Sequence, residues 1–302
     1  MITMPYDDNI TNEHIELNEK FEVILNSEIT EKEIEDSIRL LKNNKAAGYD
    51  QIVNDYLKVS NPRLISIYCN IFNIVFNSGV IPQSWSIGII LPIYKNKGDP
   101  KDPDNYRAIT LVSCLGKLFT AIINNRLSLL ADKINLISEC QTGFRKGYST
   151  IDNIFSLHAL ISLYFSLGKK LLCSFIDFRK AFDTVENRTL ANITKFGIHG
   201  KCFDIIKNMH RNIKSCVRSQ KRFSDFFPCL TGVRQCENLS PILFSLFLND
   251  LEKFLKSLEG IPPVEIKEKC MSKITRFVEL FILMYADDTV LLAVSTDDLQ
   301  KT

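Results

Sequence analysis

Three carboxylates in this sequence stand beside apolar runs, where a charge is costly. Asp287 and Asp288 lie next to each other inside FILMYADDTVLLAV (281–294), between two apolar and β-branched runs. This pattern is typical of a β-hairpin with a charged tip. Asp177 stands near the end of another apolar run, LLCSFIDF, which predicts a buried strand over 171–178. An ordinary turn is the alternative interpretation of YADD alone, because Asp is a common turn residue.

Poorly solvated like charges are stable only if a cation or a basic group faces them. If the two strands are neighbours in one antiparallel sheet, Asp177, Asp287 and Asp288 converge. Such a group of oxygen ligands suits hard divalent cations, of which magnesium is usual in phosphoryl-transfer enzymes. Two ions ~3.5–4 Å apart activate an attacking hydroxyl and stabilise a leaving pyrophosphate. The carboxylates therefore predict a divalent-metal site.

Helices and strands in alternation must position these residues. Thr30 and Glu33 form a capping box that begins a helix ending near residue 43, and Pro62 suits the first turn of a core helix ending at Gly79. Apolar periodicity predicts further helices over 116–133, 149–167, 189–196, 203–212 and from Ser240 onward. Strands are predicted over 87–95, 106–111, 215–220 and 226–230, and a polar connection over 259–273.

Basic residues follow these elements. The strands over 87–95 and 106–111 suggest a hairpin on which Lys95 and Arg107 face one cleft. The loop QTGFRKGY (141–148) combines glycines, aromatic rings and Arg145, a pattern that suits phosphate binding or stacking on bases. A solvated turn is the alternative for this loop.

The charge is unevenly distributed. The 302 residues, 45% of them hydrophobic, carry a net charge of +2, but residues 1–36 carry −9 and the rest +11. A basic body favours a polyanionic partner such as nucleic acid, because clustered cations release condensed counterions. A solvated basic surface is the alternative.

Cysteine usage and hydropathy bear on the compartment. The nine cysteines form no C-x-x-C pair and no zinc-type cluster, Met1 precedes acidic sequence, and no run approaches the ~20 apolar residues of a membrane span. We expect a reduced, soluble intracellular protein without membrane contact, in the nucleus or the cytoplasm.

Six segments occur together in a characteristic order: LKNNKAAGYDQI, NYRAITLVSCLGKLFTAIINNRL, SECQTGFRKGYSTIDNIF, CSFIDFRKAFDTV, GVRQCENLSPILFSLFLNDL and MYADDTVLLA. From about Ile29 to Thr296 the chain resembles the reverse transcriptase domain of non-LTR (LINE-type) retrotransposons. The resemblance implies an α+β right-hand polymerase core with an antiparallel palm sheet packed on helices. Its expected parts are an acidic linker (1–28), fingers (29–170) and a palm (171–302) that stops after the YADD hairpin, without a thumb.

The resemblance also implies an activity. It predicts an RNA-directed DNA polymerase that adds deoxynucleotides to a primer 3′-hydroxyl, with an RNA template, a DNA primer or target, deoxynucleoside triphosphates and two Mg²⁺ ions, or Mn²⁺ in their place. One alternative is a degenerate, non-catalytic fragment that retains nucleic-acid binding. Another is a structural protein that keeps only the fold. The oligomeric state is left open.

Residue roles follow from the matching motifs. Asp177 and Asp287 match metal ligands, with Asp288 beside them as a weaker or indirect one. Phe182 matches the steric gate that excludes a 2′-hydroxyl, with core packing as its alternative. The remaining matches are basic or polar residues near the triphosphate, the template or the templating pair, namely Lys95, Arg107, Arg145 and Gln235.

Four positions depart from the family pattern. Cys236 follows Gln235 where the family has glycine, and a glycine there lets the backbone approach the nucleotide closely. Ala47 replaces a usual proline, Gln51 a usual glycine, and Ala108 a proline or glycine. Together the departures suggest a decaying element copy.

Overall fold

The computed structural model describes residues 19–185, 193–211, 213–220, 222–229, 231–234, 237–257, 264–267, 277–280 and 282–301. The helices are α1 (Glu19–Asn26), α2 (Glu31–Arg39), α3 (Asn54–Lys58), α4 (Pro62–Ser78), α5 (Gln83–Ser86), α6 (Cys114–Lys133), α7 (Thr150–Ser166), α9 (Gly200–Met209), α10 (Ser240–Ser257) and α11 (Thr296–Lys301), with 3-10 turns at Pro103–Asn105 and Ala181–Asp183. The strands are β1 (Ile87–Tyr94), β2 (Tyr106–Leu111), β3 (Leu172–Asp177), β4 (Lys214–Ser219), β5 (Arg222–Phe223), β6 (Phe227–Pro228), β7 (Val264–Lys267), β8 (Phe277–Leu280), β9 (Ile282–Tyr285) and β10 (Asp288–Ala293).

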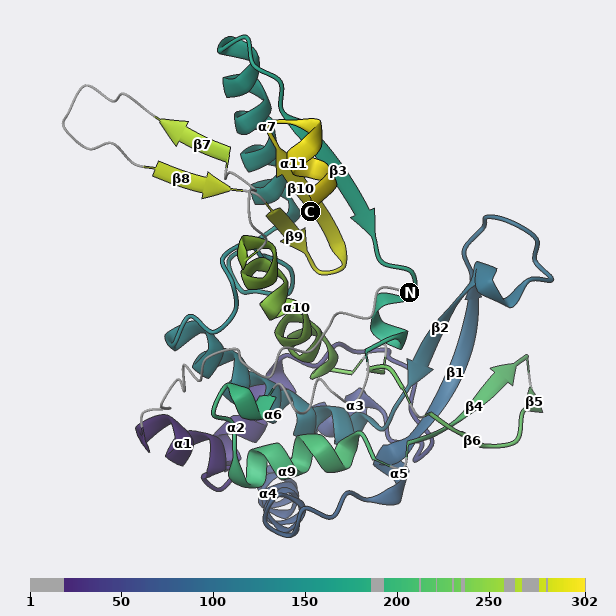
Figure 1. The fold of residues 1–302 in the computed structure, drawn as a ribbon. Coiled ribbons are helices and arrows are strands. Elements are labelled where there is room, and N and C mark those ends of the chain that lie inside the picture. Colours follow the sequence, from purple (N-terminus) through teal and green to yellow (C-terminus); the bar gives the residue numbers. More distant parts are fainter. Residues whose placement is uncertain are drawn as a thin grey trace.

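A helical body holds the largest apolar core. Figure 1 shows α1, α2, α4, α6 and α9 gathered at one end of the molecule, with α10 rising from them. Phe72 of α4, Phe119 of α6 and Trp85 meet there, with ring centroids 5.4–6.0 Å apart. Local signals begin and end these helices: Asn61 caps α4, and Gly79 ends it with φ 70°.

The first sheet extends from this body. Its strands follow the order β2-β1-β4-β5, and β6 also pairs with β4. β1 and β2 form an antiparallel hairpin, whereas β1 and β4 are parallel. The hairpin projects away from the body in Figure 1.

The second sheet, of order β3-β10-β9, is antiparallel and carries the acidic hairpin. One face packs on Leu160 and Tyr164 of α7 through Leu283 and Leu292. The other face meets Leu255 near the end of α10. Helices on both faces of this short sheet therefore fix its position relative to the helical body.

Most of the expected elements are present, and the helix expected over 189–196 lies largely outside the described residues. The strand expected to be buried over 171–178 is β3, but none of its residues is fully buried and Phe175 is 72% exposed. Three further details differ. The first core helix ends at Arg39 instead of residue 43. Part of the segment expected to be an acidic linker (1–28) is helix α1, whose Leu25 is buried in the core. The polar connection over 259–273 contains β7, which pairs with β8. The alternating VEIK of β7 carries the period-2 signal of a strand.

The expected boundary between fingers (29–170) and palm (171–302) cuts across packed elements. Helix α7 belongs to the first range but covers the second sheet, and β4 belongs to the second range but pairs with β1. The two ranges are thus interleaved in space. Within the described residues, no helix is long and apolar enough to span a membrane, and the cysteines form no disulfide bond.

Candidate active site

Asp177 and Asp288 face each other across the second sheet. They are Cα partners in the antiparallel pairing of β3 with β10, and both are exposed. Side chains of direct cross-strand partners share one face of the sheet, with Cβ atoms about 4.5–5.5 Å apart. Two carboxylates in this relation repel each other unless a cation lies between them.

A two-residue turn places the third carboxylate. Ala286 and Asp287 connect Tyr285 of β9 to Asp288 of β10, which are themselves paired. Ala286 has φ 58°, in the left-handed region that non-glycine residues seldom occupy. Asp287 is half-buried in this turn. The turn therefore sets the direction of both aspartates that follow Ala286.

The structure brings two of the three predicted carboxylates together. It pairs Asp177 with Asp288 and leaves Asp287 beside them. In the part of the chain that the structure describes, no group of three acidic, His or Cys side chains is arranged to hold a metal ion. The oxygen donors of the cross-strand pair fit a hard divalent cation, which would relieve their mutual repulsion.

The β1–β2 hairpin carries the predicted phosphate ligands on its surface. Lys95 and Arg107 are both exposed, and Lys95 Nζ donates a hydrogen bond to the Asp104 carbonyl oxygen at 2.8 Å. Arg107 stands opposite Ile93 in the hairpin. Both residues remain candidates for binding phosphate.

Asp104 links this hairpin to the segment after Asp177, a contact that the sequence did not suggest. Its carboxylate accepts from Lys180 Nζ at 2.8 Å and from Arg179 Nη2 at 2.9 Å. The hydrogen bond from Lys180 is the main reason that the pKa of Asp104 lies below its usual value, and Arg179 adds to it. Because the contact joins residues that are far apart in the chain, no local sequence pattern predicts it.

Phe182 lies at the edge of the core. Its ring stacks on Phe244 of α10, with centroids 4.6 Å apart and an interplanar angle of 18°. Its other ring neighbour is the exposed Phe144, at 6.0 Å. The half-buried ring therefore has a packing role. Its position, five residues after Asp177, keeps it a candidate for the sugar gate as well.

Arg145 is engaged within its own loop. Nη2 pairs with Glu139 at 3.3 Å, Nη1 donates to the Ser138 carbonyl oxygen, and the guanidinium lies 4.6 Å from the ring centroid of Tyr148. The side chain is only 9% exposed. These contacts favour an architectural role for Arg145 in this conformation.

Two predicted positions, Gln235 and Cys236, lie outside the described residues. Among the other departures, Gln51 is informative because it has φ 60°. This left-handed backbone is one that a glycine adopts without strain. The nearby Gly48 is required for a different reason, since a Cβ there would lie 2.5 Å from the Ser113 backbone nitrogen.

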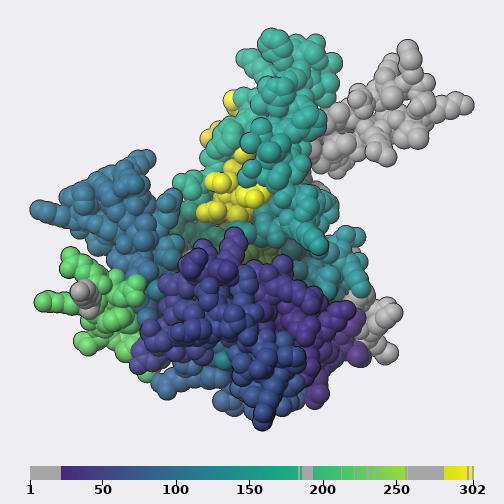
Figure 2. Space-filling model, turned by 180° about the vertical axis from the view of Figure 1, so that it is seen from behind, coloured from purple at the N-terminus to yellow at the C-terminus, as the bar shows by residue number. Residues whose placement is uncertain are grey.

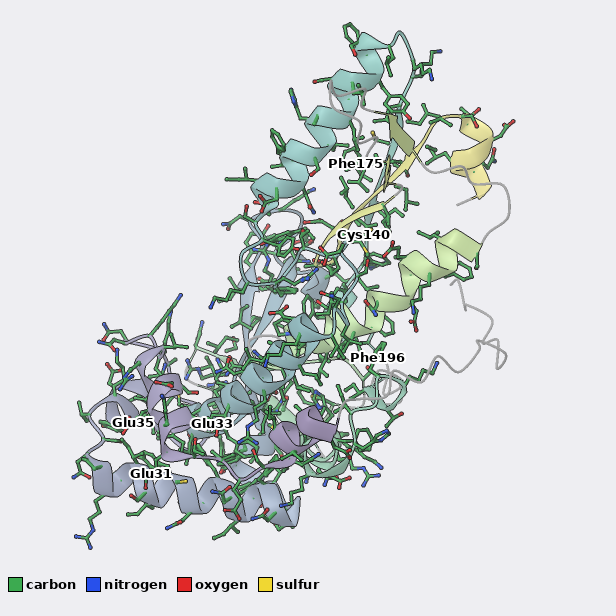
Figure 3. All side chains as sticks on the ribbon, turned by 90° about the vertical axis from the view of Figure 1, so that its left-hand side faces the viewer. Glu31, Glu33, Glu35, Cys140, Phe175 and Phe196 are labelled. Atoms are coloured by element: carbon green, nitrogen blue, oxygen red, sulfur yellow. The ribbon has the colours of Figure 1, made fainter. Side chains whose placement is uncertain are left out.

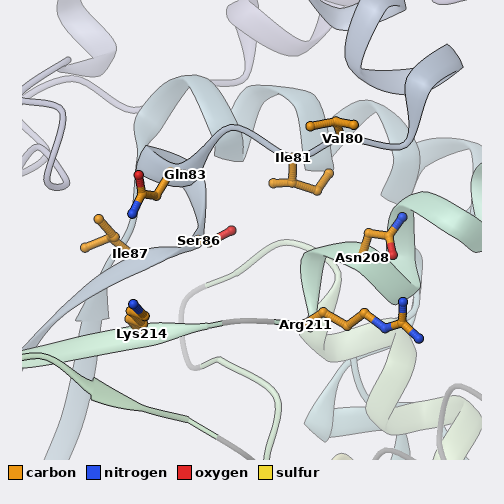
Figure 4. Close-up of a pocket in the computed structure, with 8 residues that line it drawn as sticks. All are labelled: Val80, Ile81, Gln83, Ser86, Ile87, Asn208, Arg211 and Lys214. Carbon is orange, nitrogen blue, oxygen red and sulfur yellow. The ribbon is translucent and has the colours of Figure 1, made fainter.

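A cavity of about 510 Å³ opens elsewhere, between the end of α4, α5, α9 and the start of β4. Figure 4 shows its mixed lining, in which Val80 and Ile81 lie across the cavity from the basic Arg211. None of the three aspartates lines it. Figure 2 shows instead that yellow residues of the C-terminal segment reach the surface between the teal and purple parts of the chain.

The sequence is similar to known proteins over most of its length. Residues 94–302 match the reverse transcriptase (RNA-dependent DNA polymerase) family. The chain is 30% identical, over 73% of its length, to the probable RNA-directed DNA polymerase from transposon BS of Drosophila melanogaster, of which it covers 24%. It is 28% identical, over 91% of its length, to the RNA-directed DNA polymerase from mobile element jockey of the same species, of which it covers 28%. The chain thus spans about a quarter of the length of these relatives.

Proposed function

Because the chain belongs to the reverse transcriptase (RNA-dependent DNA polymerase) family, we propose that it extends a DNA primer on an RNA template, as the polymerase domain of a non-LTR retrotransposon protein. The family predicted from the six sequence motifs is thereby confirmed. The observation that carries the proposal is the cross-strand pair of Asp177 and Asp288, with Asp287 in the adjoining turn.

In this proposal the aspartates hold divalent cations, two Mg²⁺ or Mn²⁺ ions. When bound, the ions make the primer hydroxyl a better nucleophile and offset charge on the leaving pyrophosphate. The oxygens of Asp177, Asp287 and Asp288 are the donors that such ions prefer. The turn and the sheet keep these donors in place before substrate arrives, so little reorganisation is needed during the reaction.

The basic side chains would bind and orient the nucleotide. Lys95 and Arg107 are exposed on the projecting hairpin, and charge-assisted hydrogen bonds to phosphate are strong. Asp104 ties the same hairpin to Arg179 and Lys180 beside Asp177. A triphosphate bound near Asp104 would therefore lie between the basic residues of the hairpin and those of the segment after Asp177.

We propose that the β1–β2 hairpin belongs to fingers and that the β3-β10-β9 sheet is the centre of a palm. The packing of α7 on this sheet supports counting α7 with the palm. The RNA template, the DNA primer and the deoxynucleoside triphosphates are the proposed partners. The net charge of +11 beyond residue 36 supports polyanionic ligands.

Primer extension tests the proposal. The chain is incubated with an RNA template, a DNA primer, deoxynucleoside triphosphates and Mg²⁺ or Mn²⁺. We expect incorporation by the natural sequence and a loss of about 10²-fold or more with Asp177→Asn, because one of the charges that act in the transition state is gone. Asp297→Asn, at an exposed carboxylate of α11, is the matched control and should retain activity. Binding of primer–template without any incorporation by the natural sequence would contradict the proposal.

A further inference from the structure

A short segment before α7 runs along β9 as an extra backbone partner. Met284 N donates to the Cys140 carbonyl oxygen at 2.8 Å, and Thr142 N donates to the Met284 carbonyl oxygen at 3.0 Å. Gln141 and Met284 form a parallel β-bridge. Figure 3 labels Cys140 where this segment meets the hairpin. The segment therefore leads directly to the turn that carries the aspartates.

The side chain of Gln141 holds the peptide groups of Ala286 on both sides. Oε1 accepts from Ala286 N at 2.9 Å, and Nε2 donates to the Ala286 carbonyl oxygen at 3.1 Å. Oε1 also accepts from Gly143 N at 2.9 Å. Two N–H donors on one side and a carbonyl on the other permit only this orientation of the amide. Gln141 is 1% exposed, so water does not replace these bonds.

Ala286 needs such support. A left-handed backbone at a residue with a Cβ persists only where its surroundings determine it. Gly143 allows the close approach, because a Cβ there would lie 2.1 Å from Ala286 N. The turn is thus enclosed by two residues of the segment, one that binds it and one that makes room for it.

We propose that Gln141 is a positioning residue of the active site. By fixing the Ala286 peptide groups it aims Asp287 and holds Asp288 in register with Asp177. This role rests on the proposed function, since the aspartates act only if the chain is a polymerase. Gln141 itself is buried behind the turn and acts through Ala286.

Amide hydrogen exchange tests the contact without relying on activity. Gln141→Met has a similar volume but removes the amide, so the Ala286 amide should exchange about 10-fold faster or more. Thr142→Val is the matched control. It removes one donor to the Met284 carbonyl oxygen, which still receives Thr142 N and Asn153 Nδ2. Exchange at Ala286 should be unchanged in this control, and unchanged exchange in Gln141→Met would overturn the inference.

Steady-state kinetics test the positioning role. A displacement of about 1 Å costs up to about 10²-fold in rate, so Gln141→Met should lower kcat by about 10- to 100-fold and leave KM for the nucleotide nearly unchanged. Thr142→Val should keep kcat within about 2-fold. A loss of stability alone would also lower the apparent kcat, by reducing the fraction of folded enzyme. The unfolding midpoint of each variant, measured separately, identifies such a loss.

A rescue separates positioning from general stability. In an Ala286→Gly background the left-handed backbone is unstrained, so adding Gln141→Met should cost less kcat than in the natural sequence. An equal loss in both backgrounds would overturn the inference. If the natural sequence incorporates no nucleotide, the proposed function fails, whereas the exchange of Ala286 still decides whether Gln141 sets the turn.

Discussion

Asp177 on β3 and Asp288 on β10 are direct cross-strand partners, although they lie far apart in the chain. The register that joins them also places Leu172 opposite Ala293 at the other end of the strands. A slip by one residue would move every side chain of β10 to the opposite face. The apolar packing on both faces of this sheet therefore also fixes the acidic pair.

Phe182 stands five residues after Asp177, at the position expected for the sugar gate. Phe182→Val should raise the use of ribonucleotides relative to deoxynucleotides, because it opens space under the sugar. Loss of the stack on Phe244 should also lower the free energy of unfolding by roughly 1–3 kcal/mol. The ratio of kcat/KM for the two nucleotides and denaturant unfolding measure the two effects.

Phe119→Leu, at a buried ring of the helical body that packs on Phe72 and Trp85, is the control for packing. It should lower the stability by a similar amount and leave the nucleotide ratio unchanged. If Phe182→Val also leaves the ratio unchanged, Phe182 serves the core alone.

Gln51 predicts a gain in stability. Its φ of 60° strains a residue with a Cβ by about 1 kcal/mol, which Gln51→Gly removes. The greater freedom of glycine in the unfolded chain offsets part of this gain, so the free energy of unfolding should rise by up to about 1 kcal/mol. Ala47→Gly, at an ordinary backbone angle in the same loop, should instead lower it by about 0.4–1 kcal/mol. Equal losses in the two variants, measured by thermal unfolding, would show that Gln51 is unstrained.

A buried ion pair predicts a pH dependence. Arg126 donates to Glu33 from Nε at 2.7 Å and from Nη2 at 2.9 Å, and only 5% of its side chain is exposed. Burial alone raises the pKa of Glu33, but hydrogen bonds from Arg126 and Thr30 outweigh it and hold the pKa below its usual value. The stabilising effect is therefore fully present above the unfolded pKa and is lost as the pH falls through the folded one.

Glu33→Gln keeps the capping box of α2 but leaves Arg126 with a neutral partner. At pH 7 the free energy of unfolding should fall by roughly 1.5–3 kcal/mol. The difference from the natural sequence should shrink as the pH falls below about 4.3, the usual pKa of Glu in an unfolded chain, because the unfolded carboxyl then binds a proton before the native one does. Glu35→Gln, on the same helix (Figure 3) and with 43% of its side chain exposed, should change little. A deficit of the same size at pH 3 and pH 7 would contradict the assignment.

The sequence predicted elements whose signals are local. The capping box at Thr30, the Pro62 helix start and the hairpin around Asp287 are set by neighbouring residues, and the structure contains all three. Contacts between distant segments were missed. The sequence around Asp104 does not predict its ion pairs with Arg179 and Lys180, because only the tertiary structure brings the hairpin to the loop after β3.

The candidate site shows the same division. The acidic residues beside apolar runs identified Asp177 and Asp288 as candidates. Their direct pairing depends on the order of the strands in the sheet, which the hydrophobic periodicity of the sequence does not predict. Gln141 stood inside a quoted motif as part of a basic loop, and its amide contacts with Ala286 require the tertiary structure. At Gln51 the sequence motif alone was informative. The family has a glycine at this position, and the left-handed backbone of Gln51 explains why a glycine suits it.

In the proposed function, Asp177 and Asp288 share a divalent cation. Calorimetric titration of the folded protein with Mn²⁺ measures this directly, using the natural sequence, Asp177→Asn, Asp288→Asn and the double variant. If one ion bridges the pair, each single substitution should weaken binding by about 10-fold or more, and the double variant should lose little beyond that. Unchanged Mn²⁺ affinity in Asp177→Asn, or two independent losses that add in the double variant, would contradict the account.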